Sequence, residues 1–188
     1  SFARMPQPQM KPVNLAELCK QSVFLEKNRC PEIQYELLLP DETVILICDR
    51  QQISQVLTNL LKNAAESVSS RVLENERTEE LGSISLVLKQ DDKQQTIVIS
   101  DNGNGFPEEL LDRVTEPYVT TRDRGTGLGL AIVKKIMEDH SGELILANNE
   151  TSGAKTELKF ARSLPRNELG SPNKETANDT TIEMVMNN

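Results

Sequence analysis

The sequence predicts an α/β domain, because stretches with helical and with strand periodicity follow one another along most of its 188 residues. The clearest helix is expected at residues 49–69, where apolar side chains recur every three or four positions. A second helix, apolar nearly all round, is expected at residues 127–139. Between them, residues 82–89 and 95–100 alternate apolar and polar side chains, which predicts a hairpin with its turn at residues 91–93.

The N-terminal end is expected to add a further helix. Residues 1–12 carry three prolines and no periodicity, which predicts a linker or the end of a preceding dimerisation helix. A helix is expected over residues 13–27, where Asn14 is a candidate N-cap and Glu17, three residues later, completes a capping box.

Two further pairs of strands are expected. The β-rich runs at residues 33–39 and 44–48 are separated by Pro-Asp-Glu, which predicts a hairpin with a loop of a few residues. The last two strands are expected at residues 143–147 and 155–160, with a turn at Ser-Gly 152–153 between them.

The remaining segments read as loops and tails. Residues 70–81 are strongly charged and predict a solvated loop. Residues 106–126, the lid segment, are expected to hold one short helix at most, at residues 107–113, and a loop of this length inside a domain is usually functional. Residues 163–188 are polar enough to predict a disordered tail, which leaves residues 13–162 as the folded domain.

Composition narrows the class of protein. A net charge of −8 argues against nucleic acid or an anionic membrane surface as the main partner, because both need a basic face. Cys19, Cys30 and Cys48 are odd in number and match no zinc spacing, so they are expected to be reduced. No apolar run approaches the roughly 18 residues of a membrane span. The first residue is not methionine, so the chain is expected to be a fragment.

Asp101 ends an apolar run and is followed by the glycine-rich turn Asn-Gly-Asn-Gly. A carboxylate only accepts hydrogen bonds, so at a strand end it suits an exocyclic amine such as N6 of adenine. Gly103 and Gly105 allow backbone conformations that other residues avoid and a close approach to a flat ring. An ordinary turn stabilised by the aspartate is the alternative. A calcium loop is excluded, because glycines stand where oxygen ligands are needed.

A second glycine-rich stretch, Gly125-Thr126-Gly127-Leu128-Gly129, opens the helix at residues 127–139. Bare backbone N–H groups at a helix N-terminus, with the helix dipole behind them, bind anions. The spacing is neither that of a dinucleotide fold nor that of a P-loop. The stretch therefore predicts a phosphate site, with close helix packing as the alternative.

Asn59 and Asn63 lie one turn apart on the predicted helix at residues 49–69. Two amides at this spacing can hold a hydrated Mg²⁺ against phosphates, since magnesium keeps most of its waters and takes few protein ligands. A solvated polar face is the alternative. Asn63 also borders the apolar stripe, so it is expected at a boundary between the core and solvent or ligand.

Together these motifs resemble, in order and spacing, those of sensor histidine kinases. The opening Phe-Ala-Arg-Met-Pro resembles the end of the dimerisation helix in the nitrogen-regulation, NtrY-type branch. Residues 59–66 resemble the N box, residues 101–105 the first G box, residues 116–121 the F box with Tyr118 where Phe is common, residues 125–130 the second G box, and residues 152–160 the closing glycine motif.

The resemblance implies an ATP-binding catalytic domain of the GHKL superfamily, a two-layer sandwich of a mixed five-stranded sheet with helices on one face. It implies that Asp101 binds adenine, that Asn63 holds Mg²⁺ and that Asn59 supports the phosphates. The glycines at 125, 127 and 129 would shape the phosphate end. The other cofactor-binding residues that it implies are Gly103, Gly105, Tyr118, Thr121, Thr126 and Leu128.

Two departures from the family pattern matter. Many members carry Lys three residues after the metal-binding Asn, where this chain has Glu66. Arg122 and Arg124 in the lid segment are the candidates to supply positive charge, and Arg122 is expected to be catalytic. No phosphoacceptor motif is present, and the only histidine, His140, lies at a helix C-terminus, where it is expected to contact terminal carbonyls.

The expected function is transfer of the ATP γ-phosphoryl group to a histidine on a separate dimerisation domain. A response regulator is the other expected partner. The fragment is expected to be cytoplasmic and monomeric, and its parent a homodimer anchored in a bacterial inner membrane. One alternative is a GHKL ATPase or serine kinase, which is disfavoured because Asn59 stands where such relatives carry a Glu base. The other is a non-catalytic nucleotide sensor.

Overall fold

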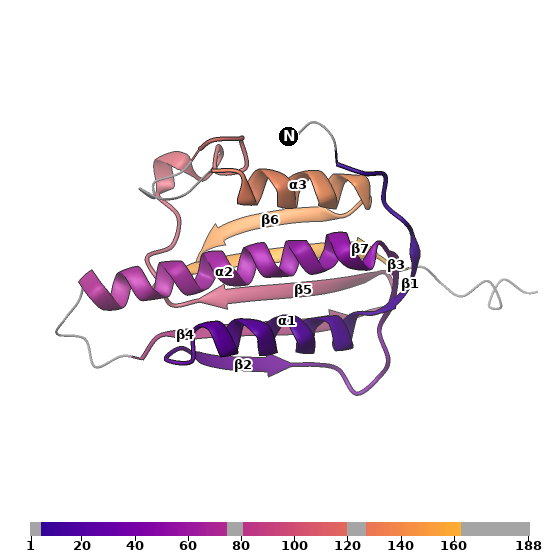
Figure 1. Cartoon of the computed structure of the whole chain (residues 1–188), viewed down its shortest axis with the longest axis horizontal. Helices are drawn as coiled ribbons and strands as arrows, with labels where there is room; N and C mark the ends of the chain where they lie inside the picture. Colours follow the sequence, from indigo (N-terminus) through magenta and orange to yellow (C-terminus); the bar gives the residue numbers. More distant parts are fainter. Residues whose placement is uncertain (1–4, 75–80, 120–126, 163–188) are drawn as a thin grey trace, which may run out of the picture.

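A computed structural model describes residues 5–74, 81–119 and 127–162 (Figure 1). In chain order the elements are β1 (Lys11–Asn14), α1 (Leu15–Arg29), β2 (Gln34–Leu38), β3 (Ile45–Cys48), α2 (Arg50–Glu74), β4 (Ser83–Gln90), β5 (Gln94–Asp101), the 3-10 helix η2 (Glu108–Leu110), α3 (Gly129–Asp139), β6 (Glu143–Asn148) and β7 (Ala154–Ala161). The main sheet has the order β2-β4-β5-β7-β6, and only β2 and β4 pair in parallel. Helices α1, α2 and α3 cover one face of it, which confirms the predicted sandwich (Figure 1).

Helix α2 lies centrally over the sheet, between α1 and α3 (Figure 1). Its apolar stripe faces the strands, and Leu57 and Leu61 are fully buried there. Ile97 of β5 and Leu158 of β7 are fully buried in the same core. Burying each such side chain contributes about 1.5–3 kcal/mol, so the stripe fixes the rotation of α2 about its axis. In the described ranges, no helix is both long and apolar enough to cross a membrane.

Several elements form where local sequence chemistry predicts them. Asn14 caps α1, since its Oδ1 accepts a hydrogen bond from the backbone N of Glu17 at 3.3 Å. Strands β4 and β5 form the predicted hairpin, and Asp91 Oδ1 closes its turn by accepting from the backbone N of Lys93 and of Gln94, each at 2.8 Å. Strands β6 and β7 pair as predicted.

The hairpin predicted from residues 33–39 and 44–48 is wrong. Strand β2 instead pairs in parallel with β4, and β3 pairs with β1 in a separate two-stranded sheet. Strand β1, which begins inside the predicted linker, was not anticipated. Both runs have strand propensity, but pairing is decided by which neighbour completes the core, and here that partner is distant in sequence.

Helix α2 continues to Glu74, so the loop predicted at residues 70–81 begins later than expected. Arg71 continues the buried side of the helix past the predicted end, which explains the extra turn. Residues 75–80 lie outside the described ranges. In the lid segment, the short helix expected at residues 107–113 is reduced to η2 and the hydrogen-bonded turns that follow it.

The segment before β1 is attached to the N-terminus of α2. Asp49 Oδ1 accepts from the backbone N of Gln52 at 3.0 Å, and its Oδ2 accepts from the backbone N of Gln9 at 2.8 Å. These donors, Gln9 first, lower the pKa of the Asp49 carboxyl. His140 Nε2 accepts from the backbone N of Asp49 at 3.0 Å, while Nδ1 lies 2.8 Å from the Ile136 carbonyl oxygen. The expected contact of His140 with a terminal carbonyl is confirmed.

We predict that Gly153→Ala lowers the free energy of unfolding by roughly 2–4 kcal/mol. Gly153 has φ +84°, and a Cβ there would lie 1.9 Å from the Asp101 carbonyl oxygen. Urea denaturation measures the effect. Gly129→Ala is the control, because its nearest heavy atom would be 3.9 Å away and alanine favours a helix. Equal stabilities of the two variants would contradict the prediction.

Candidate functional site

A cavity of about 1030 Å³ lies between α2, the end of β5 and the start of α3. Its lining brings together distant segments of the chain. Of the predicted site residues, it is lined by Asn59, Asn63, Asp101, Gly105, Gly127, Leu128 and Gly129. The described part of the lid segment contributes Phe106, Pro107, Leu110, Val114 and Val119. Thr121, Arg122, Arg124, Gly125 and Thr126 lie outside the described residues.

The Asp101 carboxylate is buried and held in a fixed orientation. Its Oδ1 accepts from the backbone N of Gly103 at 2.8 Å and from that of Ala154 at 3.3 Å, and the residue is only 7% exposed. Two backbone donors stabilise the charged form of a carboxyl group. The strand end therefore presents a positioned hydrogen-bond acceptor to the cavity.

The two glycines that follow Asp101 have different reasons to be glycine. Gly105 lines the cavity at φ +73°, as the turn predicts. Gly103 does not line it, and a Cβ there would lie 2.3 Å from Ser67 Oγ and 2.6 Å from the Ser67 carbonyl carbon. Gly103 thus lets the strand end approach helix α2, a packing role that the turn pattern alone did not indicate.

Asn59 and Asn63 both face the start of α3. Asn59 Nδ2 donates to the Gly129 carbonyl oxygen at 3.4 Å, and a Cβ on Gly129 would lie 3.9 Å from Asn63 Nδ2. Both residues are half-buried, as expected for a boundary position. Amide oxygens are hard ligands that suit Mg²⁺. The described residues hold no group of three His, Cys, Asp or Glu that could bind a metal ion.

Gly127, in the second glycine stretch, contacts Tyr118 near the end of the described part of the lid segment. Tyr118 N donates to the Gly127 carbonyl oxygen at 2.9 Å, and Gly127 has φ +67° with no room for a Cβ beside the Tyr118 backbone. Tyr118 is 76% exposed and, like Gly103, does not line the cavity. Helix α3 begins at Gly129, so its first turn borders the cavity.

Sequence reasoning missed two asparagines at the end of β6. Asn148 Oδ1 accepts from the backbone N of Phe106 at 2.7 Å, and its Nδ2 donates to the Phe106 carbonyl oxygen at 2.8 Å. Asn149 Nδ2 donates to the Asp101 carbonyl oxygen at 2.9 Å. They fix the base of the lid segment and the strand end. Only the tertiary fold brings them there, so no local signal could have indicated them.

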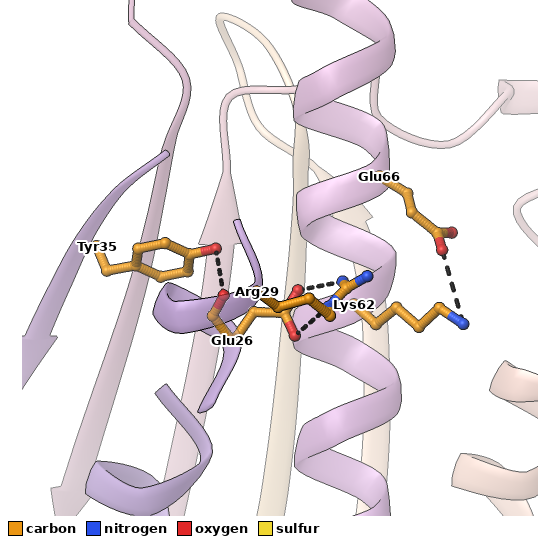
Figure 2. A network of polar contacts seen from close by, with 5 residues as sticks. All are labelled: Glu26, Arg29, Tyr35, Lys62 and Glu66. Atoms are coloured by element: carbon orange, nitrogen blue, oxygen red, sulfur yellow. Dashed lines mark hydrogen bonds and ion pairs between the residues drawn. The ribbon is translucent and has the colours of Figure 1, made fainter. Parts of the chain in front are cut away.

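A charged cluster at the rim of the cavity was also missed (Figure 2). Arg29, at the end of α1, makes a two-bond ion pair with Glu26, including Nε to Oε2 at 3.1 Å. Lys62 pairs with Glu66 one turn along α2, at 3.8 Å. Of the described residues that line the cavity, only Arg29 and Lys62 are positively charged.

Comparison with known proteins identifies relatives of this chain. The profile of a family described as histidine kinase-, DNA gyrase B-, and HSP90-like ATPase matches residues 48–164. Nitrogen regulation protein NtrY of Azorhizobium caulinodans is 44% identical over 146 residues, 78% of this chain and 18% of that protein. A Rickettsia conorii protein named as an NtrY-like sensor histidine kinase is 42% identical over 159 residues, 85% of this chain and 25% of that protein. The chain thus spans a quarter or less of these relatives.

Solved structures share the fold. The catalytic domain of histidine kinase ThkA, in a nucleotide-free form, superposes with a TM-score of 0.68 at 29% identity, covering 81% of this chain and 97% of that one. Full-length ShkA in complex with AMPPNP superposes with a TM-score of 0.70, covering 87% of this chain and 35% of that one. Its identity of 24% makes that a likeness of fold alone.

We predict that Asn148→Ala speeds backbone amide hydrogen exchange at Phe106 about 30-fold, because two hydrogen bonds of about 1 kcal/mol each are lost. Exchange measured by mass spectrometry on peptides spanning residues 102–111 tests this. Glu150→Ala, an exposed position two residues along, is the control and leaves the rate unchanged. Unchanged exchange in Asn148→Ala would show that other contacts hold the base of the lid segment.

Proposed function

We propose a function from the premise that this chain belongs to the family of histidine kinase-, DNA gyrase B- and HSP90-like ATPases. We infer that it is the ATP-binding catalytic domain of an NtrY-like sensor histidine kinase, which presents the γ-phosphoryl group to a histidine of a separate dimerisation domain. The observation that supports this most is one cavity that combines a fixed carboxylate, Asp101, with two amides, Asn59 and Asn63. ShkA, which has the same fold, holds an ATP analogue.

The adenine end of the site is Asp101. Its carboxylate accepts a hydrogen bond from the N6 amine of adenine, while the oxygen that guanine carries at that position would meet it as a second acceptor. This favours adenine over guanine. Gly105 lines that end of the cavity with a left-handed backbone, and a Cβ there would lie 2.7 Å from Asn148 Oδ1, so this turn requires glycine.

The phosphate end lies between α2 and α3. The backbone N–H groups of the first turn of α3, which starts at Gly129, and the helix dipole attract the phosphates. Asn63 holds Mg²⁺ and Asn59 contacts the phosphates, while bound Mg²⁺ neutralises charge on their oxygens. Gly127, Leu128 and the undescribed residues Thr121, Gly125 and Thr126 complete this end of the site.

The transfer itself depends on positioning and charge neutralisation. The acceptor imidazole nitrogen forms a bond to the γ-phosphorus as the bond to the bridging oxygen breaks, and ADP leaves. The imidazole proton passes to an acidic residue beside it on the dimerisation domain. His140 is not that acceptor, because both its ring nitrogens are engaged at the far end of α3.

An ATPase or serine kinase is the less favoured alternative. These reactions need a general base for water or a hydroxyl, and the amide of Asn59 has no proton affinity for that role. Asn59 moreover donates its Nδ2 to the Gly129 carbonyl oxygen. A nucleotide sensor without transfer activity is separated from the kinase by the phosphotransfer assay described below.

The partners follow from this function. They are the dimerisation domain that carries the acceptor histidine and a response regulator that receives the phosphoryl group. The parent is a homodimer anchored in a bacterial inner membrane, with this domain on its cytoplasmic side and monomeric by itself. The division into a linker at residues 1–12, a domain at residues 13–162 and a tail at residues 163–188 belongs to the same proposal.

We predict that the chain binds ADP and a non-hydrolysable ATP analogue more tightly with Mg²⁺ than without it. Asp101→Asn, which keeps one acceptor oxygen for the turn, and Asp101→Ala both weaken binding at least about tenfold, because the adenine amine loses a charged partner. Calorimetric titration measures this, with circular dichroism as the check of folding. A folded wild type that binds neither nucleotide would overturn the proposed function.

We predict that Arg122→Ala slows phosphoryl transfer to an added dimerisation domain by roughly 10- to 100-fold, while ADP affinity changes less than about twofold. The physical reason is loss of a cation that stabilises charge in the transition state. Single-turnover transfer of labelled phosphate gives the rate. A variant that transfers at the wild-type rate would remove Arg122 from the catalytic residues.

A further inference from the structure

The rim of the cavity carries the charge that the glycine and asparagine motifs do not supply. Glu66 occupies the position where many members of the family carry a lysine, and it places a carboxylate beside the cavity. A triphosphate bound there meets repulsion from Glu66 unless a cation intervenes. Arg29 and Lys62 are the described cations of the lining, so they are the described side chains that can offset this charge.

We propose that Lys62 contacts the terminal phosphate of the bound nucleoside triphosphate, and that Glu66 holds Lys62 when that phosphate is absent. This rests on the proposed function and adds a residue to it. Lys62 immediately precedes Asn63, and Figure 2 shows its side chain projecting from α2 and meeting Glu66 at its tip. Lys62 and the two amides, Asn59 and Asn63, line the same cavity.

Arg29 is held too firmly for this role. Its guanidinium makes two bonds to Glu26, whose side chain is only 6% exposed, and the hydrogen bond with Glu26 raises the pKa of Arg29. Moving Arg29 to a ligand would leave the Glu26 carboxylate buried without a partner, at a cost of several kcal/mol. Figure 2 shows the Arg29 guanidinium bonded to Glu26, whereas the tip of Lys62 meets Glu66.

Lys62 is held loosely. Its contact with Glu66 is a single one at 3.8 Å, and the two side chains are 55% and 38% exposed. Exposed pairs at this helical spacing contribute little to stability. A phosphate oxygen carrying more charge competes readily for the same ammonium, whose flexible four-carbon stem lets it exchange partners.

The exchange makes the rim selective for the third phosphate. With ADP, Lys62 remains on Glu66 and the cluster is unchanged. With ATP, Lys62 moves to the γ-phosphate, neutralises charge on its oxygens and stays there as that charge is redistributed in the transfer. Lys62 transfers no proton and forms no covalent bond to the phosphate. Removing the charge of Glu66 alone should strengthen ATP binding, because Glu66 then no longer competes with the γ-phosphate for Lys62.

The test compares the affinities of the full chain for ADP and for a non-hydrolysable ATP analogue, each with Mg²⁺, by calorimetry. We expect Lys62→Met to weaken the ATP analogue about tenfold and to leave ADP within about twofold, because a charged hydrogen bond to the third phosphate is lost. Glu66→Gln acts in the opposite direction and tightens the ATP analogue by about twofold to threefold. Lys134→Met, an exposed lysine of α3 outside the lining, is the matched control and changes neither affinity.

The outcomes separate the two proposals. If the wild type binds both nucleotides and Lys62→Met weakens them equally or leaves both unchanged, Lys62 does not contact the third phosphate and this inference is wrong. If the folded wild type binds neither nucleotide, the proposed function fails and the inference fails with it. A third outcome would also overturn the inference. Lys62→Met could weaken binding of the ATP analogue while the double variant, Lys62→Met with Glu66→Gln, binds it as tightly as the wild type. Lys62 would then act only by neutralising Glu66 and would not contact the phosphate.

Discussion

The burial of the apolar stripe of α2 against the sheet is the constraint on which the rest of the site depends. Leu57 and Leu61 are fully buried under the helix, and turning it to free either side chain would expose apolar surface at about 25 cal/mol for each Å². With the rotation fixed, successive positions of one turn acquire different surroundings. Asn59 and Asn63 face α3, and Lys62 is directed to the rim. Core packing thus selects which polar side chains meet the cavity.

The same helix is attached to both ends of α3. Asn59 contacts the Gly129 carbonyl at the cavity, and the backbone N of Asp49 donates to His140 at the opposite end. The segment before β1 joins this second contact through Gln9, and Gln52 Nε2 donates to the Pro6 carbonyl oxygen at 2.9 Å. The two walls of the cavity are therefore held by one set of polar contacts that also includes the incoming chain. The separation of the two walls therefore depends on contacts made by α2, α3 and the segment before β1 together.

The sequence predicts the parts of this fold whose physics is local. The Asn14 cap and the Asp91 turn depend on side chains within three residues of the backbone groups that they bind, and both form as expected. Strands β2 and β3 pair with strands that are distant in sequence, and for these pairings the prediction is wrong. The candidate site divides likewise: the cavity gathers seven of the predicted residues, whereas Asn148 reaches Phe106 across 42 positions of sequence. Spacing within a motif cannot indicate such a contact.

The described lining also explains how an acidic chain accommodates a polyanion. A net charge of −8 would repel a nucleotide at long range, and the described rim offers two cations, both paired with carboxylates. Under the proposed function, neutral groups carry the remaining attraction: the amides of Asn59 and Asn63 and the backbone N–H groups at the start of α3. Such donors are fixed by the fold and lose little entropy on binding, in contrast to long charged side chains. Their fixed geometry also distinguishes phosphate from other anions, because hydrogen bonds require direction where net charge does not. The cavity therefore depends on placement more than on charge, and so on the helix packing that sets it.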